Sequence, residues 1–391
     1  MEYKNLEKLS TLIQQEIDQG KISGAVIRVI HNNETFYQDE LGMADIENHI
    51  PMSRDTIFRL FSMTKPITSV AAMILYERGL LNLLAPVSDY LEGFQNQQVL
   101  TEQGTVPVIR PVTIQDLLNM TSGIVYPDQS FEAGRRMGEL FSEIERNYRQ
   151  GIYIHTVDFA NRIGRLPLEF QPGEQFRYGA SADILGAVIE VVSGKKLGKF
   201  LQEELFAPLG MTDTGFYVPK DKQDRFANIY EYNTEQKRLI HFTGDIMAIF
   251  DHKTAPTFES GGAGLVSTIK DYSRFALMLA NGGIHNGIRI LGRKTVEYLS
   301  TPQLSAAQAL TFNMDSCIGY SYGNLMRILV DPAKAASNGS IGEFGWDGWT
   351  GNYFMIDPKE KLVLIYMIQK CNGTDPTMIR KLRAITYGAL Y

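Results

Sequence analysis

The chain has 391 residues, of which 44% are hydrophobic and 21% are charged. These proportions are typical of a globular protein with a sizeable core, and the length allows two or three domains or one large two-part fold. The net charge of -6 and the absence of any cluster of lysines and arginines exclude a partnership with nucleic acid that depends on a basic face.

The N-terminal segment is polar and lacks the apolar stretch of a secretory signal. No run of about 18 apolar residues is present, so no membrane span is predicted. We therefore expect a cytoplasmic protein, or an extracytoplasmic one if a leader was removed before this sequence was recorded. Cys317 and Cys371 carry no motif, and we expect both to be buried, apolar-like side chains in a reducing compartment.

The first half of the chain carries clear local signals. Apolar residues at helical spacing predict a helix over 5–19. Two β-rich runs then flank the turn residues Asn32 and Asn33, as in a hairpin. The apolar segment 66–81 predicts a helix that ends near Gly79. Residues 125–160 are mixed and polar with weak signals. Three further helices are predicted, over 113–120, 181–193 and 195–206.

From about residue 214 onward, strand-like runs alternate with helices. The strands are predicted over 264–268, 352–357 and 361–368, and the helices over 269–281 and 293–301. This order suggests a mixed α/β (α+β) fold whose sheet is built from both chain ends, with a helical region inserted between them. We expect a sheet domain from 1–61 and 215–391, a mainly helical domain from 62–214, and an active site at their junction.

Ser62 and Lys65 stand three residues apart, which places both side chains on one face of a helix. Pro66 is tolerated in a first helical turn, so a helix is expected to begin near Ser62. A serine hydroxyl becomes a good nucleophile when a base takes its proton, and a lysine whose pKa is lowered by burial can be that base. Read alone, the same spacing also suits a helix cap beside a solvated lysine.

Five further blocks occur in an order that favours catalysis. They are IQDLLNMTSGI (114–124), LPLEFQPGEQFRYGASADILGAVIEVVSGK (166–195), ELFAPLGMTDTGF (204–216), SGGAGLVSTIKDYSRF (260–275) and FGWDGWTGNYFMIDP (344–358). With the Ser-x-x-Lys motif, they resemble the superfamily of serine β-lactamases and penicillin-binding proteins, class C-like and nearest to family VIII carboxylesterases. The resemblance implies a β-lactamase/transpeptidase-like fold, an antiparallel sheet flanked by helices with an inserted helical domain. It also implies a serine hydrolase that needs no cofactor and no metal.

The resemblance assigns Tyr178 as a general base or proton shuttle acting with Lys65. We expect a nearby ammonium to lower the pKa of this phenol and the two groups to titrate as one unit. Where the family has an asparagine two residues on, this chain has Ala180, which cannot hydrogen-bond through its side chain. Ser181 is the nearest substitute, one residue out of register. The change argues against recognition of β-lactams and D-Ala-D-Ala.

The third motif of the family, Lys-Thr-Gly, is replaced by Trp346, Asp347 and Gly348. A tryptophan cannot pair with a substrate carboxylate, and Asp347 would repel an anion if it faced the site. The resemblance places the N–H of Trp349 with that of Ser62 in an oxyanion hole, which is a large catalytic contribution in such enzymes. Composition alone equally allows both tryptophans to be packing residues.

Other motifs carry less weight. Residues 319–323 match G-x-S-x-G around Ser321, but no helix follows, so a strand is favoured over a nucleophile elbow. The six histidines lack the spacing of a zinc site. A Ser-His-Asp triad assembled from residues distant in sequence is still an alternative, and Ser321 would be its serine. The glycines of 261–264 lack the spacing of a phosphate loop, and we expect them to let backbone pass close to the site.

The aromatic residues of the middle region are expected to divide between a satellite core and the mouth of a pocket: Tyr126, Phe131, Phe141, Tyr148, Tyr153 and Phe159. The leading function hypothesis is a carboxylesterase on small neutral esters that works through an acyl-enzyme. A β-lactamase or D-alanyl-D-alanine carboxypeptidase is the first alternative, and a non-catalytic scaffold is the second. The partner is thus a small ester, β-lactam or peptide-like molecule, and the oligomeric state is open.

Overall fold

The computed structural model describes residues 2–244, 246–249 and 251–391. Its centre is an eight-stranded sheet in the order β12-β13-β14-β15-β16-β1-β2-β3, in which every neighbouring pair is antiparallel. The strands are β1 (Gly24–His31), β2 (Glu34–Asp45), β3 (Ile50–Pro51), β12 (Tyr320–Gly323), β13 (Met326–Leu329), β14 (Phe344–Asp347), β15 (Tyr353–Asp357) and β16 (Leu362–Met367). The predicted antiparallel sheet is confirmed.

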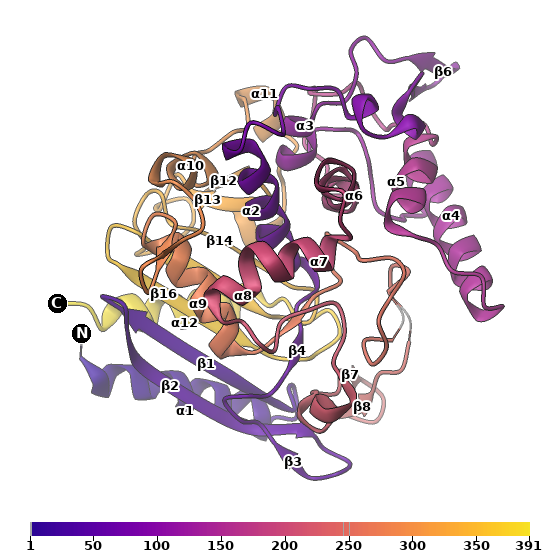
Figure 1. The fold of residues 1–391 in the computed structure, drawn as a ribbon. Coiled ribbons are helices and arrows are strands. Elements are labelled where there is room, and N and C mark those ends of the chain that lie inside the picture. The colour runs from indigo at the N-terminus through magenta and orange to yellow at the C-terminus, as the bar shows by residue number, and fades with distance from the viewer. Residues whose placement is uncertain (1, 245, 250) are drawn as a thin grey trace.

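The hairpin of β1 and β2 turns at Asn32 and Asn33, which have φ angles of 52° and 69°. Asparagine tolerates this left-handed region, and two such residues make the turn that matches the twist of paired strands. On its other side β1 pairs with β16, so strands from both ends of the chain meet in the middle of the sheet. Figure 1 shows this meeting of the indigo and yellow parts of the ribbon.

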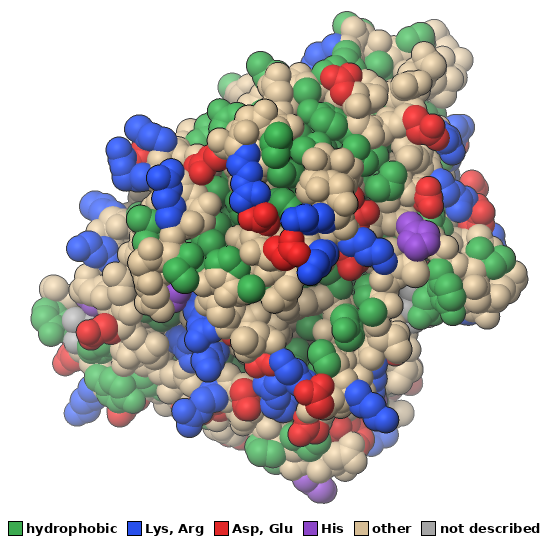
Figure 2. All heavy atoms as spheres, viewed as in Figure 1, with side chains coloured by type: hydrophobic (Ala, Val, Ile, Leu, Met, Phe, Trp, Pro, Cys, Tyr) green, Lys and Arg blue, Asp and Glu red, His purple; other side chains and the backbone are tan. Residues whose placement is uncertain are grey.

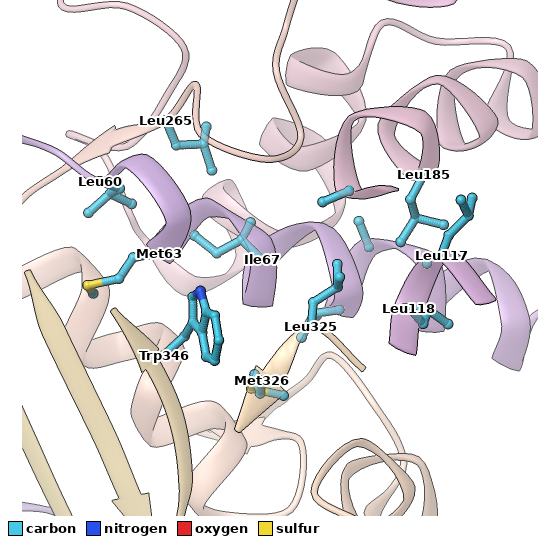
Figure 3. Close-up of a cluster of buried hydrophobic side chains, with 14 of the residues drawn as sticks. Leu60, Met63, Ile67, Leu117, Leu118, Leu185, Leu265, Leu325, Met326 and Trp346 are labelled. Atoms are coloured by element: carbon cyan, nitrogen blue, oxygen red, sulfur yellow. The ribbon is translucent and has the colours of Figure 1, made fainter. Parts of the chain in front are cut away.

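The sheet is covered on both faces because its central strands alternate between two cores. In β1, Ala25 and Ile27 pack against helices α1 (Tyr3–Asp18) and α12 (Pro376–Gly388), whereas Val26 faces the larger core on the opposite side. That larger core includes α2 (Thr64–Glu77), whose residues are buried from Thr64 to Leu75. Figure 3 shows side chains of α2 meeting Trp346 of β14 and leucines of other helices.

The remaining helices include the predicted ones together with several that the sequence does not predict. They are α3 (Ile114–Asn119), α4 (Glu132–Arg149), α5 (Thr156–Gly164), α6 (Ser181–Ser193), α7 (Leu197–Leu201), α8 (Ala207–Leu209), α9 (Ile269–Ala280), α10 (Arg293–Leu299) and α11 (Ala306–Ala309). The weak signals of 125–160 conceal α4 and α5. Helix α4 is mostly polar, and it buries only one face, which includes Met137, Phe141 and Ile144.

Short strands pair outside the main sheet: β4 (Phe58–Arg59) with β9 (Val266–Ser267), β5 (Gln98–Thr101) with β6 (Gly104–Pro107), β7 (Tyr230–Asn233) with β8 (Arg238–His241), and β10 (Ile284–His285) with β11 (Ile288–Arg289). The strand predicted over 264–268 is therefore shorter than expected. Ser321 lies in β12, which turns directly into β13, so the strand–helix context of a nucleophile elbow is absent there. Positive and negative side chains are interspersed over the face seen in Figure 2.

Candidate active site

Ser62 lies in a single 3-10 turn, Phe61–Met63, that leads directly into α2. The preceding residue, Phe61, has a φ angle of 46°, in the left-handed region that a bulky side chain rarely adopts. Such strain persists only where the surrounding structure enforces it, and here the N–H of Leu60 is held by the carbonyl of Leu265 at 2.8 Å. The Ser62 side chain is presented at a partly exposed surface, as a nucleophile requires.

Lys65 follows one helical turn later, and its side chain is fully buried. Its Nζ donates to Ser62 Oγ at 3.2 Å, to Tyr126 Oη at 3.0 Å and to the Gly262 carbonyl at 2.9 Å. The alternative of a solvated lysine beside a helix cap is therefore wrong. Burial lowers the pKa of Lys65 to about 8, although Asp183 and Asp347 act in the opposite direction. An amine with this pKa is partly neutral near physiological pH and can accept a proton.

Tyr178 joins this pair from the loop before α6. Its hydroxyl lies beside that of Ser62 and accepts a hydrogen bond from Trp346 Nε1 at 3.2 Å. Lys65 Nζ sits 4.7 Å from the centroid of its ring. Burial raises the pKa of this phenol, so the expectation that the ammonium lowers it is wrong. Desolvation outweighs the hydrogen bonds with Ser62 and Trp346, which act to lower the pKa, so Tyr178 is expected to be a neutral phenol at rest.

Tyr126 is a second tyrosine at the centre, which the sequence had suggested only as one of several pocket aromatics. Its ring stands edge-on to that of Tyr178, with centroids 5.7 Å apart. Gly179 allows this approach, because a Cβ at that position would lie 2.2 Å from the carbonyl oxygen of Ile124. The available signal was the position of Tyr126, three residues after the T-S-G block at 121–123.

The glycine-rich loop 260–264 runs between Lys65 and the start of α6. A Cβ on Gly262 would lie 2.7 Å from the carboxylate of Asp183, and the N–H of Gly262 donates to that carboxylate at 3.0 Å. Ser260 Oγ donates to the same group at 2.5 Å. Asp183, which sequence reasoning missed, therefore fixes the carbonyl that binds Lys65. The expected role of the glycines in close backbone approach is confirmed.

The third motif ends β14 beside the serine turn. Gly348 is needed there, because a Cβ at this position would lie 2.4 Å from the carbonyl oxygen of Leu60. Within the part of the chain that the structure describes, the backbone N–H groups of Ser62 and Trp349 have no backbone acceptor. The Trp349 indole packs on Phe61, with ring centroids 5.2 Å apart. These two N–H groups are thus free to serve a substrate oxygen.

The expectations for Asp347 and Ser181 need adjustment, whereas that for Ala180 does not. The carboxylate of Asp347 is bound by the buried guanidinium of Arg327 at 2.7 Å, so it is not a free anion facing a substrate. Ala180 is fully buried in the core and leaves no group at the surface of the site. Ser181 does not replace the missing asparagine, because its hydroxyl is buried and paired with that of Ser122 at 2.9 Å.

Two pockets lie near the catalytic centre, one lined by Tyr178 and one by residues of the loop 260–264. A pocket of about 220 Å³ is lined by Tyr126 and Tyr178 together with Phe131 and Met314. A pocket of about 330 Å³ lies against the loop 260–264, where Tyr148 and Tyr153 contribute to its walls. The remaining middle-region aromatics, Phe141 and Phe159, are buried in the core. The expected division of these aromatics is confirmed.

Both cysteines are buried and unbridged, as expected. Over the described ranges, no group of three or more His, Cys, Asp or Glu side chains gathers as metal ligands would. None of the helices formed by the described residues is both long and apolar enough to cross a bilayer.

The chain is similar to known proteins along most of its length. The family model described as Beta-lactamase matches residues 9–387. Protein Rv1367c of Mycobacterium tuberculosis is 33% identical over 377 residues, which are 94% of this chain and 90% of the relative. Esterase EstB of Burkholderia gladioli is 29% identical over 365 residues, 90% of this chain and 86% of the relative. The solved structure of EstCE1, a hydrolase with promiscuous acyltransferase activity, superposes with a TM-score of 0.82 at 26% identity and covers 99% of both chains.

The fold and the match along nearly the whole chain define a protein of the β-lactamase/transpeptidase-like class. The chain belongs to the Beta-lactamase family, whose relatives found here include named esterases.

Proposed function

We propose that this protein is a carboxylesterase that cleaves small neutral esters through an acyl-enzyme on Ser62. The observation that carries the proposal is the 3.2 Å contact between Ser62 Oγ and the buried amine of Lys65, whose pKa is lowered to about 8. A neutral amine at this distance can remove the hydroxyl proton as the oxygen attacks a carbonyl carbon.

The proposed reaction begins with the substrate carbonyl oxygen between the N–H groups of Ser62 and Trp349, which stabilise the charge that develops on it. Ser62 Oγ forms a bond to the carbonyl carbon while its proton passes to Lys65. As the bond to the leaving oxygen breaks, the neutral phenol of Tyr178 protonates that oxygen, and Lys65 returns a proton to the phenolate. Water then repeats the sequence on the acyl-enzyme and releases the acid.

The absence of a lysine from the third motif favours neutral substrates. Trp346 stands where classic family members carry a lysine for a substrate carboxylate, and its indole N–H is directed to Tyr178. Arg327, on the neighbouring strand β13, is buried and paired with Asp347. A β-lactam or a peptide ending in D-alanine carries a carboxylate, and the described residues of the third motif offer it no cation in place of the family's lysine. The β-lactamase or D-alanyl-D-alanine carboxypeptidase activity is therefore the second candidate, supported by the complete Ser62, Lys65 and Tyr178 set.

The test compares wild type with Ser62→Ala on p-nitrophenyl acetate and on nitrocefin, with a fluorophosphonate probe as a label for the nucleophile. We expect ester turnover and labelling in wild type, both lost in Ser62→Ala, and little nitrocefin turnover. Efficient nitrocefin turnover would move the assignment to the second candidate. Absence of both turnover and labelling would leave a non-catalytic scaffold.

A further inference from the structure

We propose that the pocket of about 220 Å³ beside Tyr126 and Tyr178 receives the leaving alcohol, and that it selects neutral aromatic alcohols. This inference rests on the proposed esterase function and extends it to the alcohol half of the substrate. It assigns Phe131 and Met314 as specificity-determining residues.

Proton transfer determines on which side of the active site the leaving alcohol departs. The group that protonates the leaving oxygen must lie within hydrogen-bond reach of it. Tyr178 stays protonated because burial raises the pKa of its phenol, and its hydroxyl lies beside that of Ser62. The leaving alcohol therefore departs on the Tyr178 side. The pocket on that side is the one whose wall Tyr178 itself forms.

Four aromatic side chains contribute to the walls of this pocket: Tyr126, Phe131, Phe176 and Tyr178. The rings of Tyr126 and Tyr178 stand edge to face with centroids 5.7 Å apart, and the ring of Phe176 packs edge-on against Phe312 with centroids 4.7 Å apart. Phe131 also lines the pocket, and Met314 adds a flexible apolar group. Aromatic pairs in such geometry stabilise a bound ring beyond the effect of burial alone, and a thioether adds a favourable contact with a ring edge.

The charges at the mouth favour a neutral alcohol. Arg177 lines the pocket, with its guanidinium 5.1 Å from the centroid of the Phe131 ring, but it is bound to Glu169 at 2.7 Å. Asp128, the other charged group in the lining, is of opposite sign. The polar Thr311 is engaged as well, since its hydroxyl accepts from the N–H of Phe176 and donates to the carbonyl of Gln308. No unpaired cation is offered to an anionic leaving group among the described residues that line this pocket.

The experiment uses benzyl acetate and butyl acetate, which give the same acetyl-enzyme and alkoxides of similar basicity. The variants are Phe131→Ala, which removes one aromatic wall, and Met314→Trp, which fills the pocket. Tyr76→Ala is the matched control, because Tyr76 is 44% exposed on α2 and lies outside the pocket lining. Wild type is expected to prefer benzyl acetate in kcat/KM. Both variants should lower the benzyl-to-butyl ratio about tenfold, and the control should leave it unchanged.

A second readout separates leaving-group binding from damage to the catalytic centre. The alcohol has departed before water attacks the acetyl-enzyme. The rate of hydrolysis of the acetyl-enzyme, measured by rapid quench, should therefore equal that of wild type in both variants. An unchanged benzyl-to-butyl ratio, or a deacylation rate that falls with it, would overturn the assignment. So would variants that alter the preference between butyl acetate and butyl hexanoate instead, because the pocket would then hold the acyl group. Ester turnover that survives in Ser62→Ala would overturn the proposed function together with this inference. If Ser62→Ala loses turnover but Phe131→Ala and Met314→Trp keep the wild-type benzyl-to-butyl ratio, this inference alone would be overturned.

Discussion

Lys65 Nζ lies 3.0 Å from the phenol oxygen of Tyr126, so the amine beside Ser62 has a tyrosine partner in addition to Tyr178. A neutral phenol that accepts a hydrogen bond from an ammonium stabilises the charged form of the amine. The same contact limits how far burial can lower the pKa of Lys65. Tyr126 is thus a positioning residue that adjusts the base.

Replacing Tyr126 by Phe should therefore move the pH profile. Loss of the acceptor is expected to lower the pKa of Lys65 further, so the ascending limb of kcat/KM should shift to lower pH by up to about one unit. Tyr322→Phe is the control, because the Tyr322 hydroxyl is buried without a hydrogen-bond partner among the described residues. A profile identical to that of wild type would contradict the role of Tyr126.

The wild-type profile itself tests Lys65 as the base. Only the neutral amine accepts the serine proton, and its pKa is lowered to about 8. The value of kcat/KM should therefore rise tenfold per pH unit below about 8 and level off above it. The free enzyme is measured with p-nitrophenyl acetate at subsaturating concentration. A limb near pH 6 would point to a histidine as the base instead.

Lys65 is also expected to cost stability. Its pKa is about 8 in the folded chain against an ordinary value of 10.5, so the unfolded chain binds more protons between these two values. The free energy of unfolding should therefore increase as pH rises from about 8 to 10.5, and the full penalty is present below pH 8. Lys65→Met should abolish turnover, raise stability at pH 7 by ~2 kcal/mol and remove this pH dependence. Denaturant titrations at several pH values measure both; a less stable variant would contradict the penalty.

Gly348 should be intolerant of any side chain. A Cβ there would lie 2.4 Å from the carbonyl oxygen of Leu60, in the backbone that leads into the Ser62 turn. Gly348→Ala should push the end of β14 away from the serine, lower kcat at least about a hundredfold through loss of oxyanion alignment, and lower the melting temperature. Gly342→Ala offers a control, because a Cβ there meets no atom within 4 Å, so this variant carries only the backbone strain of a φ of 92°. Equal effects on kcat at the two positions would refute the specific contact.

The ion pair behind the site gives a fifth prediction. Arg327 and Asp347 are almost fully buried, with side-chain exposures of 3% and 14%. Asp347→Ala would leave a buried guanidinium unpaired and should lower the free energy of unfolding by ~3 kcal/mol. The double variant Arg327→Met/Asp347→Leu should recover most of this loss, since an apolar pair of similar volume replaces the ion pair. Equal destabilisation in single and double variants would count against the pairing.

Local patterns predicted the parts of the molecule that local chemistry determines. The hairpin follows from Asn32 and Asn33, and the end of α2 from Gly79, because single residues set those turns. Ser62 and Lys65 meet because they are one helical turn apart. The contacts of Lys65 with Tyr126 and Gly262 span 61 and 197 residues, and no periodicity encodes them.

Sequence patterns could not predict the charge states of the site residues either. Charge proximity alone suggested a more acidic Tyr178, whereas burial, which only the packed structure defines, raises the pKa of its phenol. The same holds for Asp347, whose charge is balanced by Arg327 from a neighbouring strand. Helix α4 was missed because its few apolar residues form one narrow stripe among charged neighbours.

The pairing of β1 with β16 has a consequence for biosynthesis. Residue 26 stands opposite residue 367, so more than three hundred residues leave the ribosome before the central pair of strands can form. Until then, β1 and β2 expose a long apolar edge of the kind that promotes aggregation, and such distant partners make folding slow. The nascent chain should therefore depend on chaperones until its last strands emerge.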